Sequence, residues 1–245
     1  MDIHGATIDE LFALARSAET EAAYWEVVSE LHGRADKRTF DLAAVLCDSF
    51  AVGERCLGAD VLGQLGATPG ASAAESPFAS EAGRVLIGLL EEELEPSVLS
   101  SAAIGLGHLR DERALPRLAT LAAHPDVLVR RGVVHGLMGH DEDRAVAALI
   151  RLSDDWDGDV RDWATFSLAI QIERDTPEVR AALAARLSDD HGDTRAEAIR
   201  GLARRGDERA LGPALAADLS PEIKEAIEEL AEATDDPRLR ERLEA

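Results

Sequence analysis

A short acidic stretch holds the densest set of side chains that could do chemistry. Residues 154–163 read DDWDGDVRDW, with carboxylates at nearly every second position. Alternating oxygen ligands of this kind are typical of calcium loops. The stretch lacks the regular Asp or Asn spacing before the loop glycine and the distant bidentate Glu. We therefore expect a loop between two helices, with aspartates that cap the following helix, and no metal site.

The histidines and cysteines offer a second set of candidate ligands. The seven histidines form no HExxH motif, and Cys47 and Cys56 are two thiols nine residues apart. Neither pattern is a metal site or a disulfide framework. His108 and His140 end two similar stretches of sequence, where we expect solvated helix-end histidines rather than a metal pair.

Catalytic motifs are absent from the sequence. It contains no Walker, GxGxxG or GxSxG pattern, each of which would indicate a specific chemistry. Pairs of acidic residues do not indicate a catalytic site, because such pairs occur throughout so acidic a chain. We predict no catalytic residue and no cofactor, and therefore a protein that is not an enzyme.

One arginine recurs in a repeated phrase. The phrase reads VRRGVVHGL at 129–137, VRDWATFSL at 160–168 and TRAEAIRGL at 194–202, and a fourth copy lies at 52–62. Each copy places an arginine seven residues before a leucine. The arginines are Arg55, Arg130, Arg161 and Arg195. One interpretation, which we prefer, is a charge-assisted bond to an aspartate of the same or adjacent repeat. The other is a row of guanidinium groups awaiting an acidic ligand.

Acidic residues also recur just before these phrases. Asp126, Asp159 and Asp193 precede the second helix of their repeats. A carboxylate at such a position accepts backbone N–H bonds and complements the positive end of the helix. We predict that these three aspartates cap the helices.

The spacing of the equivalent leucines predicts the fold class. They are Leu62, Leu106, Leu137, Leu168, Leu202 and Leu230, with separations of 44, 31, 31, 34 and 28 residues. A period near 31 without strand alternation predicts stacked helix pairs. Residues 67–80, rich in Ala, Ser, Gly and Pro, predict a loop insertion. Residues 1–38 fit the phrase poorly and predict an N-terminal helical cap with a Thr7–Glu10 capping box.

These phrases resemble HEAT-like repeats, particularly the short bacterial type found in phycobilin lyase subunits. The resemblance covers roughly residues 39–240. It implies an all-α fold, a right-handed α-solenoid (superhelix) of about six helix pairs, with 39–245 as one continuous domain. It also implies that the Leu-rich helix of each pair is convex and the Val-Arg helix lines the concave side. Leu99 stands where the other copies have arginine, so we expect any ladder of arginine contacts to be interrupted there.

Composition and charge restrict the partners. Hydrophobic residues make up 46% and aromatic residues 4% of the chain, and 26 basic against 48 acidic residues give a net charge of −22. Such a charge repels nucleic acid and favours a basic partner, although adaptation to high salt also produces acidic surfaces. We expect the acidic run Glu91–Glu95 to be a solvated helix end. The same run could also bind a basic partner. No membrane span or signal pattern is found, so we expect a cytoplasmic protein.

The function expected from the sequence is a non-catalytic scaffold or interaction module that binds a protein or peptide on its concave face. An acidic inhibitor or immunity protein of a basic enzyme is one version. The enzyme alternatives come from the resemblance alone: a phycobilin lyase-like or a DNA glycosylase-like protein. The concave positions not needed for packing are the predicted partner-binding residues: Arg131, His135, Arg161, Asp162, Trp163, Thr165 and Glu197.

Overall fold

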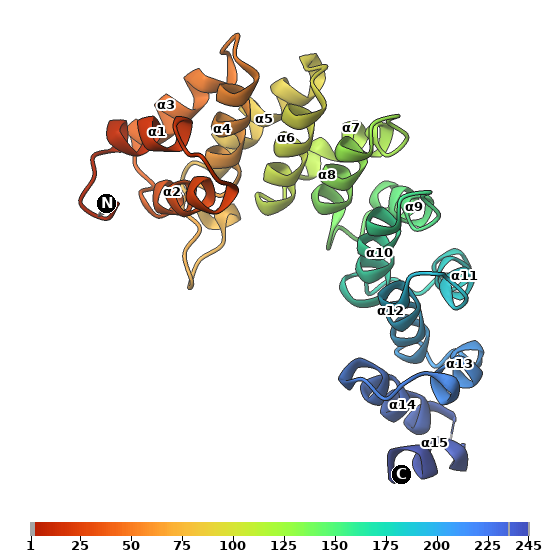
Figure 1. Cartoon of the computed structure of the whole chain (residues 1–245). Coiled ribbons are helices and arrows are strands. Elements are labelled where there is room, and N and C mark those ends of the chain that lie inside the picture. The colour runs from red at the N-terminus through yellow and green to blue at the C-terminus, as the bar shows by residue number, and fades with distance from the viewer. Residues whose placement is uncertain (1–2, 235, 245) are drawn as a thin grey trace. The chain divides into compact units, whose positions relative to one another are not determined.

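The computed structural model describes residues 3–234 and 236–244, and within these ranges the regular structure is helical, without a β-strand. The chain divides into two compact units, Met1–Gly136 and Leu137–Ala245. Figure 1 shows the order of the helices along the chain. The all-helical class predicted from the leucine spacing is confirmed. The division between a cap at 1–38 and one continuous domain at 39–245 stays a prediction.

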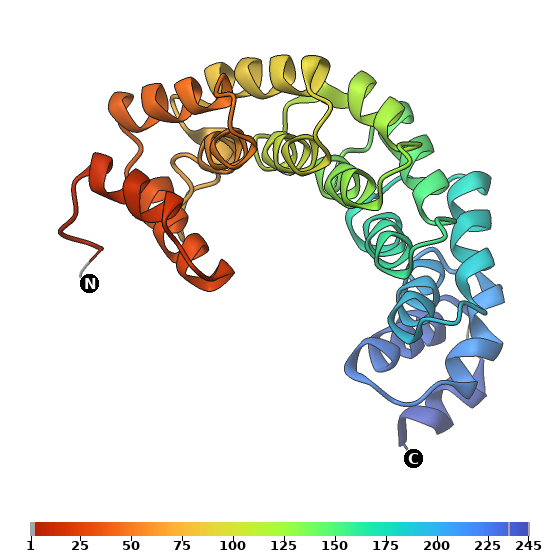
Figure 2. The same ribbon diagram turned by 45° about the horizontal axis from the view of Figure 1, so that its top comes forward.

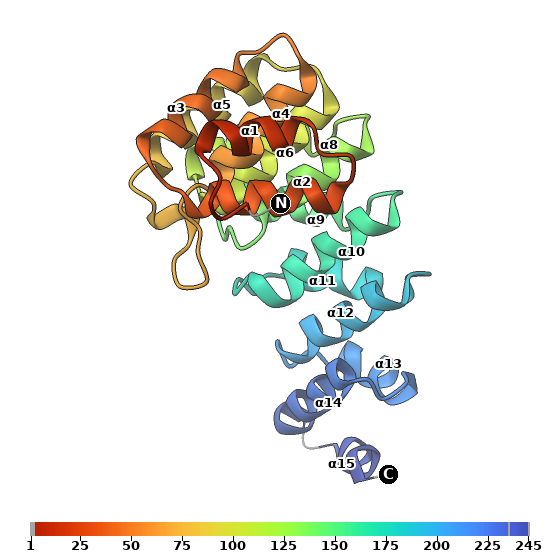
Figure 3. The ribbon, with the colours of Figure 1, turned by 60° about the vertical axis from the view of Figure 1, so that its left-hand side comes forward.

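The first unit contains four helix pairs. They are α1 (Ile8–Arg16) with α2 (Glu21–Gly33), α3 (Lys37–Cys47) with α4 (Val52–Gly63), α5 (Ala79–Glu92) with α6 (Pro96–His108), and α7 (Leu115–Leu121) with α8 (Val127–Leu137). In the first pair, α1 and α2 both contact α4 (Figure 3). The capping box of α1 is confirmed, with Thr7 bonded to the Glu10 N–H and Glu10 reaching back.

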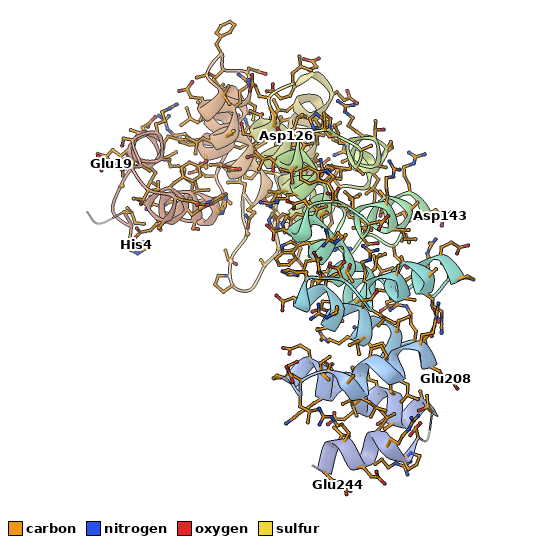
Figure 4. The ribbon with its side chains drawn as sticks, turned by 45° about the vertical axis from the view of Figure 1, so that its right-hand side comes forward. His4, Glu19, Asp126, Asp143, Glu208 and Glu244 are labelled. Atoms are coloured by element: carbon orange, nitrogen blue, oxygen red, sulfur yellow. The ribbon has the colours of Figure 1, made fainter. Side chains whose placement is uncertain are left out.

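The second unit contains three further pairs and a last helix. They are α9 (Asp143–Leu152) with α10 (Gly158–Phe166), α11 (Pro177–Arg186) with α12 (Gly192–Ala203), α13 (Leu211–Ala216) with α14 (Pro221–Thr234), and then α15 (Pro237–Glu244). Asp143 and Glu208, at the start of two of these pairs, point outward from the same side of this unit (Figure 4).

Within each unit the helices form two layers (Figure 2). The first helices of the pairs lie in one layer and the second helices in the other. We call the layer of α4, α6 and α8, or of α10, α12 and α14, the second-helix layer. These are the helices that carry the repeated phrase, so the predicted order within a pair, with this helix second, is confirmed.

The repeated leucines fill the space between pairs. Leu62, Leu106, Leu168, Leu202 and Leu230 are all buried. Small residues let the second helices approach closely. A Cβ atom on Gly63 would lie 2.4 Å from the Cα atom of Gly105 on the neighbouring α6. The small residues of the repeated phrase are therefore needed for the close spacing of the second helices, and they do not indicate a binding or catalytic site.

The segment between α4 and α5, where a loop insertion is predicted, has local structure. Thr68 pairs with Ala71 across a tight turn, and a short 3-10 helix follows at Ala73–Glu75. Phe78, just before α5, stacks on Phe40 of α3 with ring centroids 5.5 Å apart. The aromatic contact anchors the end of the insertion to the first helix layer.

Side-chain contacts mark two helix boundaries. Helix α3 begins at Lys37, because the Asp36 side chain accepts the Thr39 N–H at 2.8 Å. Helix α10 continues into a π turn at Ser167–Gln171. The buried Arg205 side chain donates to the carbonyl oxygens of Leu168, Ala169 and Ile172. The wide π turn leaves carbonyl groups without partners inside the helix. An arginine that is distant in the sequence donates hydrogen bonds to them instead.

The glycine contact gives a direct test of the packing. We expect Gly63→Ala to lower the free energy of unfolding by about 1–3 kcal/mol, because the added methyl group must separate α4 from α6. Gly53 lies on the same helix, and a Cβ there meets nothing within 4 Å. Gly53→Ala should be neutral or stabilising by up to about 1 kcal/mol. Urea denaturation of both variants measures the difference, and equal effects would contradict close packing at Gly63.

Candidate partner-binding face

The recurring arginine closes the loop of its own repeat. In each copy its Nη1 atom donates to the carbonyl oxygen six residues earlier, and in three copies also to the one five residues earlier. Arg55, for example, bonds Ser49 O at 2.9 Å and Phe50 O at 3.2 Å. Since loop carbonyls have no helical partner, one guanidinium group fixes the turn between the two helices of a pair.

The same arginine also reaches the loop of the next repeat. Arg55 Nε lies 2.6 Å from a carboxylate oxygen of Glu93. Arg161 donates Nε and Nη2 to the two oxygens of Asp189, both at 3.0 Å, and Nη2 also to Asp190 at 2.8 Å. The preferred interpretation, a charge-assisted bond to an aspartate of the same or adjacent repeat, is confirmed for Arg161, and Arg55 makes the equivalent bond to a glutamate.

The acid that binds the recurring arginine occupies a constant position in its own repeat. The repeat that follows Leu99 has no acid at this position. Glu93 and Asp189 each stand six residues before the arginine slot of their own repeat. Leu99 fills that slot after Glu93, and the residue at the acid position of the following repeat is His124. Leu99 is buried and cannot form the arginine's bond. The predicted interruption of the arginine contacts therefore involves both sides of the missing bond, Leu99 and His124.

Arg161 is consequently a structural residue. Its guanidinium is largely buried and bonds both Asp189 and its own loop. The pKa of Asp189 is held below its usual range by Arg161 and by the His191 N–H, against the effect of burial. The prediction that Arg161 is available to a partner was wrong.

Asp162 lies beside Arg161 but faces the neighbouring helix. Its Oδ1 atom accepts the Thr194 hydroxyl at 3.1 Å and lies 3.8 Å from His191 Nδ1. Burial raises the pKa of the Asp162 carboxyl, even though the Thr194 hydrogen bond lowers it. This carboxylate is half-buried and has capacity for a further donor.

Trp163 is a large apolar side chain of α10 that is exposed. It is 42% exposed and packs edge-to-face against Phe166 at 5.8 Å. Trp156 belongs to the preceding loop and is 74% exposed. The predicted presence of Trp163 on the accessible surface of the second-helix layer agrees with the structure.

Glu197 belongs to α12, the next second helix. It bonds Arg200 Nη1 through both oxygens at 3.2 Å, and Arg200 also bonds Glu225 of α14 at 3.0 Å. Burial raises the pKa of Glu197, and the charge of Asp162 adds to this effect. The two carboxylates therefore share one electrostatic environment across α10 and α12.

The remaining predicted residues lie elsewhere. Thr165 is fully buried, and its hydroxyl bonds the Arg161 carbonyl at 2.7 Å, so its predicted place on the accessible face was wrong. Arg131 and His135 are half-buried on α8 in the first unit. The structure brings Asp162 and Glu197 close enough to interact electrostatically in the second unit, and Trp163 follows Asp162 on α10.

The acidic stretch 154–163 is a capping loop, as predicted. Asp157 caps α10 by accepting the Val160 N–H at 3.1 Å, and Asp154 bonds Arg186 at 2.9 Å. The capping residue is therefore Asp157 rather than the predicted Asp159. No group of three potential ligands is placed to hold a metal ion anywhere in 3–234 or 236–244.

A polar cluster in the first unit was not predicted. The Tyr24 hydroxyl donates to Asp60 at 2.6 Å, and His32 Nε2 lies 3.0 Å from the Asp60 carbonyl oxygen. Burial lowers the pKa of His32, His108 and His135, and the charge of His108 lowers the other two further. The three histidines come from α2, α6 and α8, so their proximity depends on the packing of repeats and is not visible in local sequence.

The bond between repeats gives a stability prediction with a matched control. We expect Arg161→Gln to destabilise the chain by up to about 3 kcal/mol, because the buried Asp189 carboxylate loses its two-point cation and keeps only Arg186 at 3.5 Å. Arg195 occupies the same position in the next repeat but bonds only the Asp189 carbonyl within the described residues. Arg195→Gln should cost less than about 1 kcal/mol. Equal losses in urea denaturation would contradict the proposed bridge.

The buried histidines predict a pH dependence. As pH falls below about 6.5, these histidines are protonated in the unfolded chain but stay neutral in the folded state, because their pKa values are lowered there. Each therefore destabilises the fold by up to about 1.4 kcal/mol per pH unit. We expect the wild-type Tm to fall from pH 7.5 to 5.5, and the slope to be smaller for His108→Gln/His135→Gln. Identical slopes in calorimetry would contradict the depressed pKa values.

Comparison with known proteins identifies the repeats. A family model described as HEAT repeats matches residues 83–169. Over 83 residues the chain is 35% identical to Protein YibA of Escherichia coli strain K12. That stretch is 34% of this chain and 29% of YibA, so it spans less than a third of the relative. The X-ray structure of E. coli YibA aligns with a TM-score of 0.77 at 24% identity, over 99% of this chain and 88% of YibA.

More distant structures share the architecture. The complex of CpcE and CpcF of phycocyanin lyase from Nostoc sp. PCC7120 aligns with a TM-score of 0.53 at 17% identity, over 98% of this chain and 94% of that one. A designed armadillo repeat protein in complex with the peptide (KR)4 aligns at 0.50 and 14% identity, over 85% and 99%. At these identities the likeness shows the fold alone. Residues 83–169 thus match HEAT repeats, and the stacked helix pairs have the fold of HEAT-like repeat proteins.

Proposed function

We propose that this protein is a non-catalytic interaction module that binds a basic protein or peptide through the second-helix layer of its second unit. The observation that carries the proposal is the combination of Asp162, Trp163 and Glu197. These are two partly buried carboxylates and one exposed indole on neighbouring helices.

The electrostatics of the two carboxylates favour a cationic ligand. Burial raises the pKa of both Asp162 and Glu197, which means that their charges are less well stabilised than in water. A guanidinium or ammonium group of a partner would supply the missing stabilisation through charge-assisted hydrogen bonds. Trp163 adds a ring face for the same cation.

The fold suits such a partner. Solenoids present extended surfaces because each repeat contributes an equivalent strip. The designed armadillo protein in complex with (KR)4 is an example of a related fold that holds an alternating Lys-Arg peptide. The net charge of −22 would accelerate encounter with a basic partner at low salt. An acidic inhibitor of a basic enzyme is one form that this function would take in the cytoplasm.

The likeness to CpcE and CpcF supports one alternative, a role in bilin attachment. A bilin-binding protein would change the absorption spectrum of a bilin on mixing. We propose the interaction module in preference, because the recurring residues are engaged in packing and in bonds between repeats. Nucleic-acid chemistry is disfavoured by the net charge.

The proposed face is tested by a labelled (KR)4 peptide and a matched Asp-Glu peptide. We expect the basic peptide to bind and its affinity to fall with salt. Trp163→Ser/Glu197→Gln should weaken binding about tenfold or more, because it removes the ring and one charge. Fluorescence anisotropy measures the affinity, and far-UV circular dichroism checks that helicity is retained.

Leu243→Ser serves as the control variant, since Leu243 is also an exposed apolar residue of the second unit but lies on α15. Its affinity should equal that of the wild type. Equal affinity of the Trp163/Glu197 variant and the wild type, or preferential binding of the acidic peptide, would sink the proposal.

A further inference from the structure

Exposed apolar side chains gather at one end of two helix pairs in the first unit. Phe50, between α3 and α4, is fully exposed. Leu94, between α5 and α6, is 86% exposed, and Val45 of α3 is 68% exposed. Large apolar residues exposed together mark an interaction site more often than single ones do.

The two loop residues occupy the same position in successive repeats. Phe50 precedes Arg55 by five residues, and Leu94 precedes Leu99 by five. Pro125 and Trp156 occupy this position in the next two repeats. An outward apolar residue is thus a repeated property of these loops, and a packing explanation fails because the side chains of Phe50 and Leu94 are exposed.

The loops that present Phe50 and Leu94 are held rigidly. Arg55 donates to the Phe50 carbonyl at 3.2 Å and to Glu93 at 2.6 Å. Glu93 in turn accepts the Leu94 N–H at 2.8 Å. A continuous chain of hydrogen bonds therefore joins the two backbones, so the loops that carry both side chains are positioned before any partner arrives. Preorganisation of this kind reduces the entropic cost of binding.

A hollow of about 780 Å³ adjoins this hydrogen-bonded pair. It lies between α3 and α5, which contact one another, and Arg55 and Glu93 are part of its lining. Val45, Val85 and Leu89 supply apolar surface. Gly88 leaves the middle of α5 bare, since a Cβ atom there would meet nothing within 4 Å. The hollow has the size of a site for several side chains of a partner segment.

The charges around the hollow are mostly negative. Four carboxylates line it, against two guanidinium groups, and one of those two, Arg55, is already bound to Glu93. Asp48 and Glu92 are exposed and form no ion pair within the described residues. Glu92 belongs to the acidic run Glu91–Glu95, which encloses the exposed Leu94.

We propose that this hollow, with Phe50 and Leu94 on its flank, binds a basic amphipathic segment of a partner protein. The apolar face of the segment would cover Val45, Val85 and Leu89, and its Lys or Arg side chains would meet Asp48 and Glu92. A second copy of this chain or an anionic membrane fits less well, because both repel a chain of charge −22. This surface belongs to the first unit and is separate from the face proposed above.

The test uses a fluorescein-labelled amphipathic Lys/Leu peptide, a Glu/Leu peptide of the same pattern, and the full chain. We expect the Lys/Leu peptide to bind and the Glu/Leu peptide to bind at least tenfold more weakly. Phe50→Ser/Leu94→Ser should weaken Lys/Leu binding tenfold or more, because these residues supply the exposed apolar contacts. Asp48→Asn/Glu92→Gln should weaken it severalfold and flatten its salt dependence.

A glycine substitution separates binding from stability. Gly88→Gln projects a side chain into the hollow from a position where a Cβ atom meets nothing within 4 Å, and it replaces glycine by a better helix former, so Tm should stay the same or rise while Lys/Leu affinity falls tenfold. Trp156→Ser is the control, since it changes the equivalent loop residue in the other unit and should leave the affinity unchanged.

Three results would overturn the proposal. The first is an unchanged Lys/Leu affinity in the Gly88→Gln and Phe50/Leu94 variants. The second is equal binding of the Glu/Leu peptide. The third is self-association in sedimentation velocity that the Phe50/Leu94 variant abolishes, which would make the occupant a second copy of this chain. The Trp163/Glu197 variant should still bind the Lys/Leu peptide through the first unit, so the two proposed surfaces fail or succeed separately.

Discussion

The bond from one arginine to two loops is the interaction on which the arrangement of the repeats depends. Arg161 satisfies carbonyl groups of its own loop and binds the Asp189 carboxylate of the next. A helix pair has no partner for its loop carbonyls and buries only one apolar side by itself. The arginine supplies the polar half of the contact between repeats, and leucines such as Leu168 and Leu202 supply the apolar half. The accessible surface of each unit consists of the side chains that these contacts leave uncovered.

The sequence predicts this fold well because its determinants are local and periodic. The arginine-to-leucine spacing and the capping box at Thr7 depend on residues within a few turns of one another, and both agree with the structure. The preferred role of the arginine also follows from the adjacent aspartates. The exact helix starts are less predictable, because several acids compete for one cap, as Asp157 and Asp159 do before α10.

The candidate site was harder to predict, because accessibility is set by neighbouring repeats. Periodicity places Arg161, Trp163 and Thr165 on one helix but does not say which side chain a neighbour covers. Thr165 is buried and Arg161 is bound to the next loop, whereas Trp163 is exposed. The cluster of Tyr24, Asp60 and His32 joins helices far apart in the sequence, and no local pattern signals it. Alignment of the loops by the arginine slot would have revealed Phe50 and Leu94.

The register also explains why acidic surfaces of this protein differ in availability. An acid six residues before the arginine slot, such as Glu93 or Asp189, is bound by the preceding repeat and has little capacity for a partner. Acids outside that register, such as Glu92, Asp162 and Glu197, are not bound by the recurring arginine. Net charge alone therefore overstates the negative surface that a partner meets. The acids available for recognition are those that the stacking interaction leaves over, and they lie beside exposed apolar residues in both units.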